Sequence, residues 1–404
     1  EAHNNLGNVL FELSEFDKAL DCYKKAVEIN PNFSDAFNNL GNVYFNKENF
    51  NEAIENYELA ISTGSGLRKD KPYYNLGNIY RELGDFKKSI DLYKKSIDIN
   101  PNSVSTYINL SISLNKNGNL NEAISCCEKA IEKDPTNVVA LNNLGEFNQE
   151  IGKENLSITY YEKALKFNST NLRSRWLLMN TFPIIYKNFE QINYFKNHFE
   201  KNLKAIENLV NENDIIEKKQ ILSALNSSTN FYLHYHGDDI TSLQKRYGAV
   251  VHKLTKHIYP EFHKKIPFNK SSKFIKVGFI SSFFCEHIVS KLFKNWIIKL
   301  NKNKFKTFVY HVGTENDHVT GLIKKNCYSF FHKTNTYNVI NQIISDQLDV
   351  LIFLDIGMVP KMQILGSLRL ASIQCCTWGV PVTTGFKNMD YFLSGENMET
   401  DSSQ

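Results

Sequence analysis

The tripeptide Asn-Leu-Gly occurs at residues 5–7, 39–41, 75–77 and 143–145, and residues 109–111 read Asn-Leu-Ser. Successive copies are 34, 36, 34 and 34 residues apart. A small side chain returns at one equivalent position after each copy, namely at Ala19, Ala53, Ser89, Ala123 and Ser157. Three of the units close with a proline, which is Pro31, Pro101 or Pro135. A repeat of this length, with small residues where helices cross and proline at the turn, predicts antiparallel helix pairs stacked into a solenoid.

This period and pattern are those of tetratricopeptide repeats, in which neither helix of a unit can bury its apolar face alone. We expect five units over residues 1–168. The longer interval contains the helix-poor run Ser62-Thr-Gly-Ser-Gly66, which predicts an extended turn. Over residues 169–270 the signature is lost while an aromatic-rich helical pattern persists, so we expect a degenerate repeat or cap followed by a helical connector.

Past the connector, the period of the hydrophobic pattern changes. Short apolar runs rich in β-formers begin at Phe274, Lys306, Asp349 and Ala371, and sequence that can form helices separates them. Such runs are typical of parallel strands that are buried on both faces. We therefore predict a doubly wound, Rossmann-like lobe over residues 271–404. The expected fold class is α plus α/β.

Composition narrows the class of protein. The chain has 404 residues, is 42% hydrophobic and 22% charged, and carries a net charge of +4 from scattered basic and acidic residues. These values predict a soluble globular protein of two or three packed regions, with neither nucleic acid nor a membrane as a partner. Seven cysteines without a CxxC pair predict reduced thiols in the cytoplasm and no metal site. Because the chain starts without Met inside a repeat, we expect a truncated N-terminus.

The loop Ser281–His287 is the first candidate for chemistry, because ligands of doubly wound sheets bind beyond the carboxyl ends of the strands. His287 precedes a predicted helix, whose N-terminus favours a neutral imidazole that can accept a proton. The alternative interpretation, and the commoner one for a loop histidine, is that the residue is structural or incidental.

Two further loops are expected at the same edge of the sheet. The candidate rim residues of the first are Asp355, Gly357 and Met358. The candidate ligand-holding residues of the second are Gly379, Pro381, Thr383, Thr384 and Gly385. Glycine backbone, a rigid proline and hydroxyl groups are suited to holding an oxygen-rich ligand. The alternative interpretation is an ordinary Gly/Pro/Thr turn.

An asparagine occupies one equivalent position on the first helix of every unit. The five residues are Asn5, Asn39, Asn75, Asn109 and Asn143. Stacking of the units would align them, and because a carboxamide both donates and accepts, such a row can hold an extended peptide whatever its side chains. Alternatively, asparagine is simply common at this position in an Asn-rich chain.

Several sequence blocks follow the repeats in a fixed order. They are Ile275–Ser282 with His287, Asp355-Ile-Gly-Met, Arg369-Leu-Ala-Ser-Ile-Gln, Trp378–Gly385 and Met389-Asp-Tyr-Phe-Leu-Ser. Together they resemble the protein O-GlcNAc transferase/SPINDLY family in its bacterial form. The resemblance implies the first half of a two-lobed, GT-B-type inverting glycosyltransferase that needs no metal. Members transfer a sugar from a nucleotide diphosphate, usually N-acetylglucosamine from UDP and in some cases fucose from GDP, to Ser or Thr of proteins.

The resemblance also implies roles for individual residues. His287 matches the loop histidine that lies over the sugar and the acceptor and has been proposed as a base. The segment containing Gly379, Pro381 and Thr383 matches the loop that packs against the donor sugar, and the asparagine row matches a ladder that holds acceptor proteins. Two residues depart from the family pattern: Phe283 stands where Asp is frequent, and Val380 where bacterial members commonly have His.

Two hypotheses follow from these observations. In the first, the chain is an enzyme fragment in which a peptide-recruiting solenoid precedes half of a sugar-transfer domain. Because the diphosphate contacts of the family come mostly from a second lobe, which would follow Gln404, we expect this piece to be inactive alone. In the second, the chain is a non-catalytic peptide-binding scaffold with a degenerate lobe, a reading that Phe283 and Val380 favour.

Overall fold

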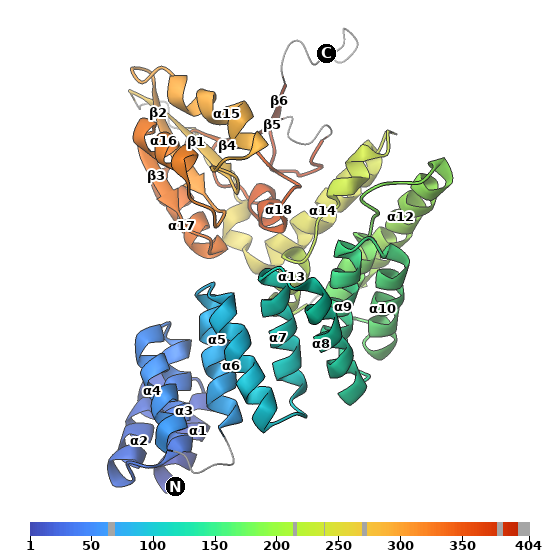
Figure 1. The fold of residues 1–404 in the computed structure, drawn as a ribbon. Helices are drawn as coiled ribbons and strands as arrows, with labels where there is room; N and C mark the ends of the chain where they lie inside the picture. Colours follow the sequence, from blue (N-terminus) through green and yellow to red (C-terminus); the bar gives the residue numbers. More distant parts are fainter. Residues whose placement is uncertain (64–68, 213–215, 238, 269–272, 378–382, 395–404) are drawn as a thin grey trace. The chain divides into compact units, whose positions relative to one another are not determined.

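The computed structural model describes residues 1–63, 69–212, 216–237, 239–268, 273–377 and 383–394 (Figure 1). The chain divides into two compact units, Glu1–Phe167 and Asn168–Gln404. The first unit is helical, and the second joins a helical segment to a parallel sheet. The predicted fold class is therefore confirmed.

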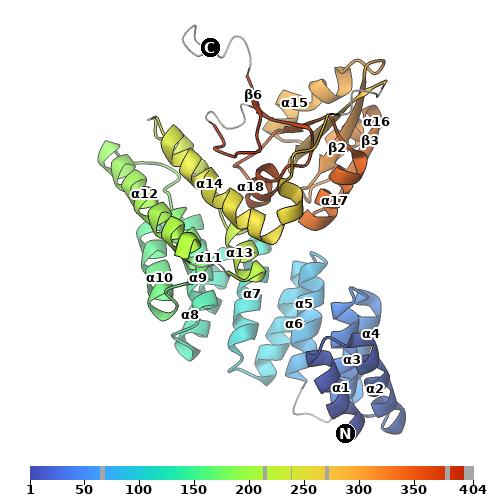
Figure 2. The same ribbon diagram turned by 180° about the vertical axis from the view of Figure 1, so that it is seen from behind.

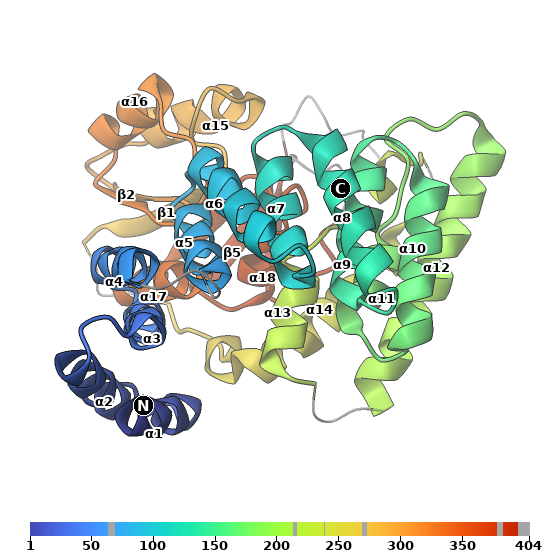
Figure 3. The ribbon, with the colours of Figure 1, turned by 60° about the horizontal axis from the view of Figure 1, so that its bottom comes forward.

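The first unit is a series of helix pairs that follow one another along the chain, as the blue to green helices of Figure 3 show. The pairs are α1 (Ala2–Glu12) with α2 (Phe16–Ile29), α3 (Ser34–Asn46) with α4 (Phe50–Thr63), α5 (Asp70–Glu82) with α6 (Phe86–Ile99), α7 (Val104–Lys116) with α8 (Leu120–Lys133), and α9 (Val138–Glu150) with α10 (Glu154–Phe167). The small residues that mark the repeat are completely buried, as expected where helices cross closely.

The glycine of Asn-Leu-Gly is required by a tyrosine of the second helix. A Cβ atom on Gly41 would lie only 2.5 Å from Cε1 of Tyr57, whose side chain is 1% exposed. The same contact recurs between Gly7 and Tyr23, Gly77 and Tyr93, and Gly145 and Tyr161. In the fourth unit both partners differ, and the thiol of Cys127 donates a hydrogen bond to Oγ of Ser111 at 3.2 Å. In this repeat the residue on the first helix is thus larger than glycine, and its partner on the second helix is smaller than tyrosine.

The helical part of the second unit precedes the sheet in the sequence and is drawn in green to yellow in Figure 2. Its elements are α11 (Leu172–Met179), α12 (Phe189–Glu212), α13 (Lys218–Leu225), the 3-10 turns η1 (Phe231–Tyr235) and η2 (Pro260–His263), and α14 (Thr241–Ile258) between the two turns. Trp176 is fully buried, and its indole N–H donates to the carbonyl of Ser228 at 3.0 Å. This segment forms one compact unit with the lobe that follows.

The lobe contains a six-stranded sheet in the order β3-β2-β1-β4-β5-β6, in which all neighbouring strands are parallel. The strands are β1 (Ile275–Ser281), β2 (Phe305–His311), β3 (Ser329–His332), β4 (Val350–Phe353), β5 (Ile373–Thr377) and β6 (Tyr391–Leu393). The helices are α15 (Ile288–Lys299), α16 (His318–Asn326), α17 (Thr336–Asp346) and α18 (Pro360–Ser367). This strand order is that of the Rossmann fold.

Four of the strands were predicted from their apolar runs, and two were not. The edge strands β3 and β6 have only four and three residues, and neither contains a fully buried residue. Short, half-exposed edges do not produce the continuous apolar signal of a central strand. By contrast, β1 and β4 contribute Val277, Phe279 and Ile352 to a core that Phe293 and Ile297 of α15 complete.

Candidate functional site

The strand order changes direction at the carboxyl ends of β1 and β4. These two strands are neighbours, whereas the chain continues from β1 towards β2 on one side and from β4 towards β5 on the other. Doubly wound folds bind their ligands at such a switch point, between loops that leave in opposite directions. The loops that begin after Ser281 and Phe353 therefore form the rim of the candidate site.

Asp355 is the most perturbed group of this rim. Its side chain is completely buried, and Oδ2 accepts the backbone N–H of Ser282 at 3.0 Å. Burial raises the pKa of Asp355 to about 7, although the hydrogen bonds of the Ser281–Ser282 turn partly oppose the shift. Within the described residues, neither Oδ1 of Asp355 nor the Ser282 hydroxyl has a hydrogen bond of good geometry. A buried carboxyl group with spare bonding capacity at a ligand crevice is a functional-site candidate.

His287 caps the helix that follows the first rim loop. Its Nδ1 accepts the backbone N–H of Val289 at 3.2 Å, and its ring stacks on Phe283 with centroids 4.0 Å apart and planes 15° from parallel. The Nδ1 lone pair is thereby occupied, so the neutral ring carries its proton on Nε2. In this arrangement the half-buried imidazole offers an N–H group rather than a free lone pair.

The second rim loop folds back on the first. Gly357 has a φ of +87°, and the N–H of Met358 donates to the carbonyl of Asp355 at 3.2 Å, which makes a tight turn. The side chains of Met358 and Phe283 pack against the same hydrophobic core. Together with the bond from Ser282 to Asp355, this packing brings the two predicted loops into one place.

The third predicted loop is described only from Thr383 onward, and Gly379 and Pro381 lie outside the described residues. The hydroxyl oxygens of Thr383 and Thr384 each accept a backbone N–H two residues ahead, both at 3.2 Å. Gly385 has a φ of +70°, and a Cβ atom there would lie 2.0 Å from the carbonyl oxygen of Gln244. On the facing helix α14, a Cβ on Gly248 would lie 2.2 Å from the carbonyl oxygen of Gly385. Two glycines therefore allow backbone-to-backbone contact between this loop and α14.

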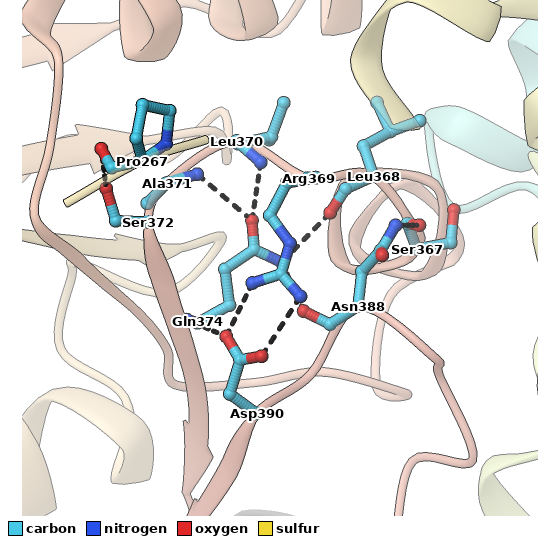
Figure 4. A network of polar contacts seen from close by, with 10 residues as sticks. All are labelled: Pro267, Ser367, Leu368, Arg369, Leu370, Ala371, Ser372, Gln374, Asn388 and Asp390. Atoms are coloured by element: carbon cyan, nitrogen blue, oxygen red, sulfur yellow. Dashed lines mark hydrogen bonds and ion pairs between the residues drawn. The ribbon is translucent and has the colours of Figure 1, made fainter. Parts of the chain in front are cut away.

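A polar network fixes the chain on both sides of that loop (Figure 4). The guanidinium group of Arg369 makes a bidentate ion pair with Asp390, with one of the two contacts at 3.0 Å. The side chain of Gln374 donates to the carbonyls of Leu368 at 2.9 Å and Asn388 at 3.0 Å. Asp390 also accepts the N–H of Gln374 at 2.8 Å. Two of the sequence blocks that resemble the family, those that begin at Arg369 and Met389, are thus joined by these bonds. Their polar residues stabilise the fold of the lobe.

Lys361 is a charged residue of the rim that sequence reasoning missed. Its ammonium group donates to the carbonyls of Val312, at 3.3 Å, and Thr334, so it joins the loops after β2 and β3 to the start of α18. Burial lowers the pKa of Lys361. Its position directly behind Pro360, at a helix start that follows a rim loop, was the signal that could have identified it.

In the first compact unit, contacts between successive repeats use part of the hydrogen-bonding capacity of the asparagine row. Nδ2 of Asn75 donates to Oδ1 of Asn38 and Oδ1 of Asn42 in the preceding unit, both at 3.0 Å. Equivalent pairs of bonds run from Asn39 to Asn4 and Asn8, and from Asn109 to Tyr74 and Asn78. The amide hydrogens of these residues are therefore not available to a peptide, and our expectation that each carboxamide both donates and accepts needs correction. Only the carbonyl oxygen remains.

A second asparagine, three residues later, complements the first. Oδ1 of Asn42 accepts both the hydroxyl of Tyr57, at 2.8 Å, and Nδ2 of Asn75. Asn8 and Asn78 accept their two bonds in the same way. Their side chains make no other hydrogen bond within the described part of the chain, so each retains an amide donor beside the carbonyl acceptor of the first asparagine. The spacing Asn-x-x-Asn was the signal in the sequence.

The solvent exposure of the asparagine row changes from the first repeat to the fifth. Asn5 is exposed, Asn39, Asn75 and Asn109 are half-buried, and Asn143 is only 2% exposed. The unit before Asn143 has Ile108 and Ile112 at the positions that elsewhere accept the amide hydrogens. Isoleucine accepts no hydrogen bond, so this bonding pattern ends at Asn109.

Two general features complete the description of possible sites. Across the described ranges, no three His, Cys, Asp or Glu side chains come together in a way that could hold a metal ion. None of the described helices is both long and apolar enough to cross a bilayer.

The order of the parts defines a class of protein: helical repeats joined to one Rossmann-like lobe of the type found in two-lobed glycosyltransferases. Models of the tetratricopeptide repeat match residues 1–33 and 71–103, and a second such model matches residues 22–55, 92–125 and 126–158. The model of glycosyl transferase family 41 matches residues 196–401. The chain belongs to glycosyl transferase family 41. This family membership confirms the resemblance that the sequence blocks after the repeats indicated.

Several solved structures are similar to the chain. A mutant of the O-GlcNAc transferase of Thermobaculum terrenum is similar with a TM-score of 0.50 and 14% identity, and the match covers 80% of this chain and 53% of that one. The chain thus spans about half the length of that relative. PilF of Pseudomonas aeruginosa matches at 17% identity and a TM-score of 0.44, over 52% of this chain and 90% of that one. YrrB, a tetratricopeptide protein with a peptide-binding site, matches at 26% identity and a TM-score of 0.36, over 41% of this chain and 85% of that one. No curated protein sequence matches the chain.

Proposed function

We propose that the chain is part of an inverting protein O-glycosyltransferase that transfers a sugar from a nucleotide diphosphate to Ser or Thr of proteins held along the repeats. The family membership of residues 196–401 carries the proposal, because it joins this lobe to sugar transfer. The resemblance to the O-GlcNAc transferase/SPINDLY family favours UDP-N-acetylglucosamine as the donor. We also propose a cytoplasmic location, which the seven free cysteines support.

The acceptor protein would bind along the repeats through its backbone. The remaining carbonyl of Asn75 can accept a peptide N–H, and the remaining amide of Asn78, one helical turn away, can donate to a peptide carbonyl. A peptide recognised through its main chain can vary in side chains, which suits an enzyme with many acceptors. The first three units supply both groups of this surface, and the fourth supplies only the carbonyl of Asn109, because Ile112 stands where the second asparagine would be.

At the rim, the proposed role of His287 is donation of a hydrogen bond to an oxygen of the sugar, the diphosphate or the acceptor. The occupied Nδ1 supports donation over proton abstraction. An N–H directed at developing negative charge is worth about 100-fold or more in rate. Asp355 would hold the Ser281–Ser282 turn that precedes His287, and its spare oxygen would receive a proton or a hydroxyl of the ligand.

A transfer assay tests the proposal in the protein that carries this sequence. Ser/Thr peptides are incubated with UDP-N-acetylglucosamine, UDP-glucose or GDP-fucose, and mass spectrometry detects the added sugar. His287→Ala should reduce the rate about 100-fold, whereas His287→Gln, which retains a side-chain N–H, should keep more of it. His318→Ala is the matched control, because His318 is exposed and also lies at a helix start of this lobe. Equal loss in the Ala and Gln variants would return His287 to the role of a base.

A non-catalytic scaffold is the second candidate, and one contact favours it. Phe283, which replaces an acidic residue frequent in the family, stacks directly on His287 and covers one face of its ring. If no nucleotide sugar supports transfer while fluorescence anisotropy still detects peptide binding, the scaffold interpretation replaces the enzyme. Loss of both activities would reject the two candidates together.

A further inference from the structure

A cavity of about 530 Å³ lies at the amino ends of β4 and β5, at the opposite end of the strands from the rim loops. Its walls come from the connector segment 261–267, from residues 344–349 at the end of α17, and from residues 369–372 before β5. All three segments belong to the second compact unit. The volume is within the usual range for sites that bind small molecules.

Two hydrogen bonds fasten the connector on both sides of this cavity. The N–H of Arg369 donates to the carbonyl of Phe262 at 2.7 Å, and the hydroxyl of Ser372 donates to the carbonyl of Pro267 at 2.9 Å. Figure 4 shows the second bond beside the network of Arg369 and Asp390. Because these bonds hold the walls in place, a ligand would enter a preformed site and would not have to order it.

The interior of the cavity is mainly apolar. Phe262, Ile266, Leu348 and Leu370 are among the residues that line it. Two of the charged groups that also line it are already engaged: Asp349 accepts the N–H of Lys276 at 2.8 Å, and the guanidinium group of Arg369 is paired with Asp390. A ligand body that fits these walls is therefore apolar.

The uncommitted charges of the cavity lie on the connector. Lys264 and Lys265 are exposed, and they form no hydrogen bond or ion pair with any part of the chain that the structure describes. Two carboxylates also line the cavity: Glu261 precedes the lysine pair on the connector, and Asp349 is buried and accepts the N–H of Lys276. An anionic substituent would therefore bind at the exposed connector, next to the two ammonium groups and away from the buried Asp349.

From this arrangement we propose that the cavity binds a small organic anion with an apolar, ring-containing body, which inserts between Phe262 and Leu370 while the Lys264–Lys265 pair holds its charged group. The site takes a carboxylate, sulfonate or phosphate on an aromatic or alicyclic body. It is independent of the proposed sugar transfer, because it uses none of the rim residues.

The test uses the 404-residue chain and two fluorescent probes with the same ring system. One is 8-anilinonaphthalene-1-sulfonate, which is anionic, and the other is N-phenyl-1-naphthylamine, which is neutral. The anionic probe should bind saturably at one site, and the double variant Lys264→Ala/Lys265→Ala should weaken it about tenfold while leaving the weaker neutral probe unchanged. The matched control Lys324→Ala/Lys325→Ala removes an equally exposed lysine pair from α16 and should change affinity less than about twofold.

A third variant tests the location of the site. Ile344→Trp places a larger side chain at a half-buried position of the wall and should abolish binding of both probes, with circular dichroism confirming the fold. Non-saturable binding, equal effects of the two lysine pairs, or full binding by Ile344→Trp would each overturn the proposal.

Discussion

The contact between Gly41 and Tyr57 permits a double-mutant test in which the chain itself supplies the compensated pair. A serine at position 41 would place its Cβ about 2.5 Å from the ring, and the ring is 1% exposed and cannot move into solvent. Overpacking of this kind costs about 2 kcal/mol. Tyr57→Cys removes the ring and its hydrogen bond to Asn42, and should cost about 3 kcal/mol.

The double variant Gly41→Ser/Tyr57→Cys reproduces the Ser111–Cys127 pair of the fourth unit. The steric overlap disappears once the ring is gone, so the double variant should cost no more than Tyr57→Cys alone. The expected coupling between the two positions is therefore about 2 kcal/mol in the favourable direction. The chain would thus show that the two positions are coupled through their contact, and that neither residue type is required by itself.

Hydrogen exchange followed by mass spectrometry on peptides from α3 and α4 measures the local opening free energy. Gly41→Ser should speed exchange there about 30-fold, since 1.36 kcal/mol corresponds to a factor of ten. Gly321→Ser on α16 is the control, because a Cβ there would meet nothing within 4 Å. Strict additivity of the two substitutions, or an unaffected Gly41→Ser, would refute the steric explanation.

Two further predictions concern the second unit. Burial raises the pKa of Asp355 from its ordinary value of 3.8 to about 7 in the folded protein. The free energy of unfolding should therefore fall by about 4 kcal/mol in total as pH rises between these two values. Asp355→Asn should abolish this pH dependence in thermal melts from pH 4 to 8, and the same pH dependence in the variant and the unaltered protein would exclude Asp355 as its source. Gly248→Ala would place a Cβ 2.2 Å from the backbone of Gly385 and should destabilise the protein by about 3 kcal/mol with faster exchange at residues 383–394, whereas Gly321→Ala, in open space, should stabilise it by about 1 kcal/mol.

Much of the fold could be predicted because its signals are periodic and local. The Asn-Leu-Gly copies indicated the helix pairs, and the apolar runs at Phe274 and Asp349 indicated strands that became β1 and β4. The edge strands could not be predicted, because a segment such as Ser329–His332 is too short to show periodicity and its burial depends on a neighbour distant in sequence.

The position of the rim loops could be predicted, whereas the hydrogen bonding of their residues could not. The strand ends predicted that Asp355 and the loop of His287 lie at one edge of the sheet, since parallel strands align their carboxyl ends. Which atom of His287 is free depends on the bond from Val289, and the exposure of Asn143 depends on its neighbours in space. The contact between Gly248 and Gly385 joins segments that are far apart in sequence, so neither segment alone predicts it.

The end of the paired asparagine bonds at Asn109 makes the joints of the repeat array unequal. Two amide bonds cross each joint between the first helices of the first four units. Between α7 and α9, Ile108 and Ile112 instead pack with Ala140, and Nδ2 of Asn115 donates to Glu150 at 3.0 Å. Because dispersion contacts have no preferred direction whereas paired hydrogen bonds do, we expect the first three joints to bend alike under load and the joint between α7 and α9 to bend differently.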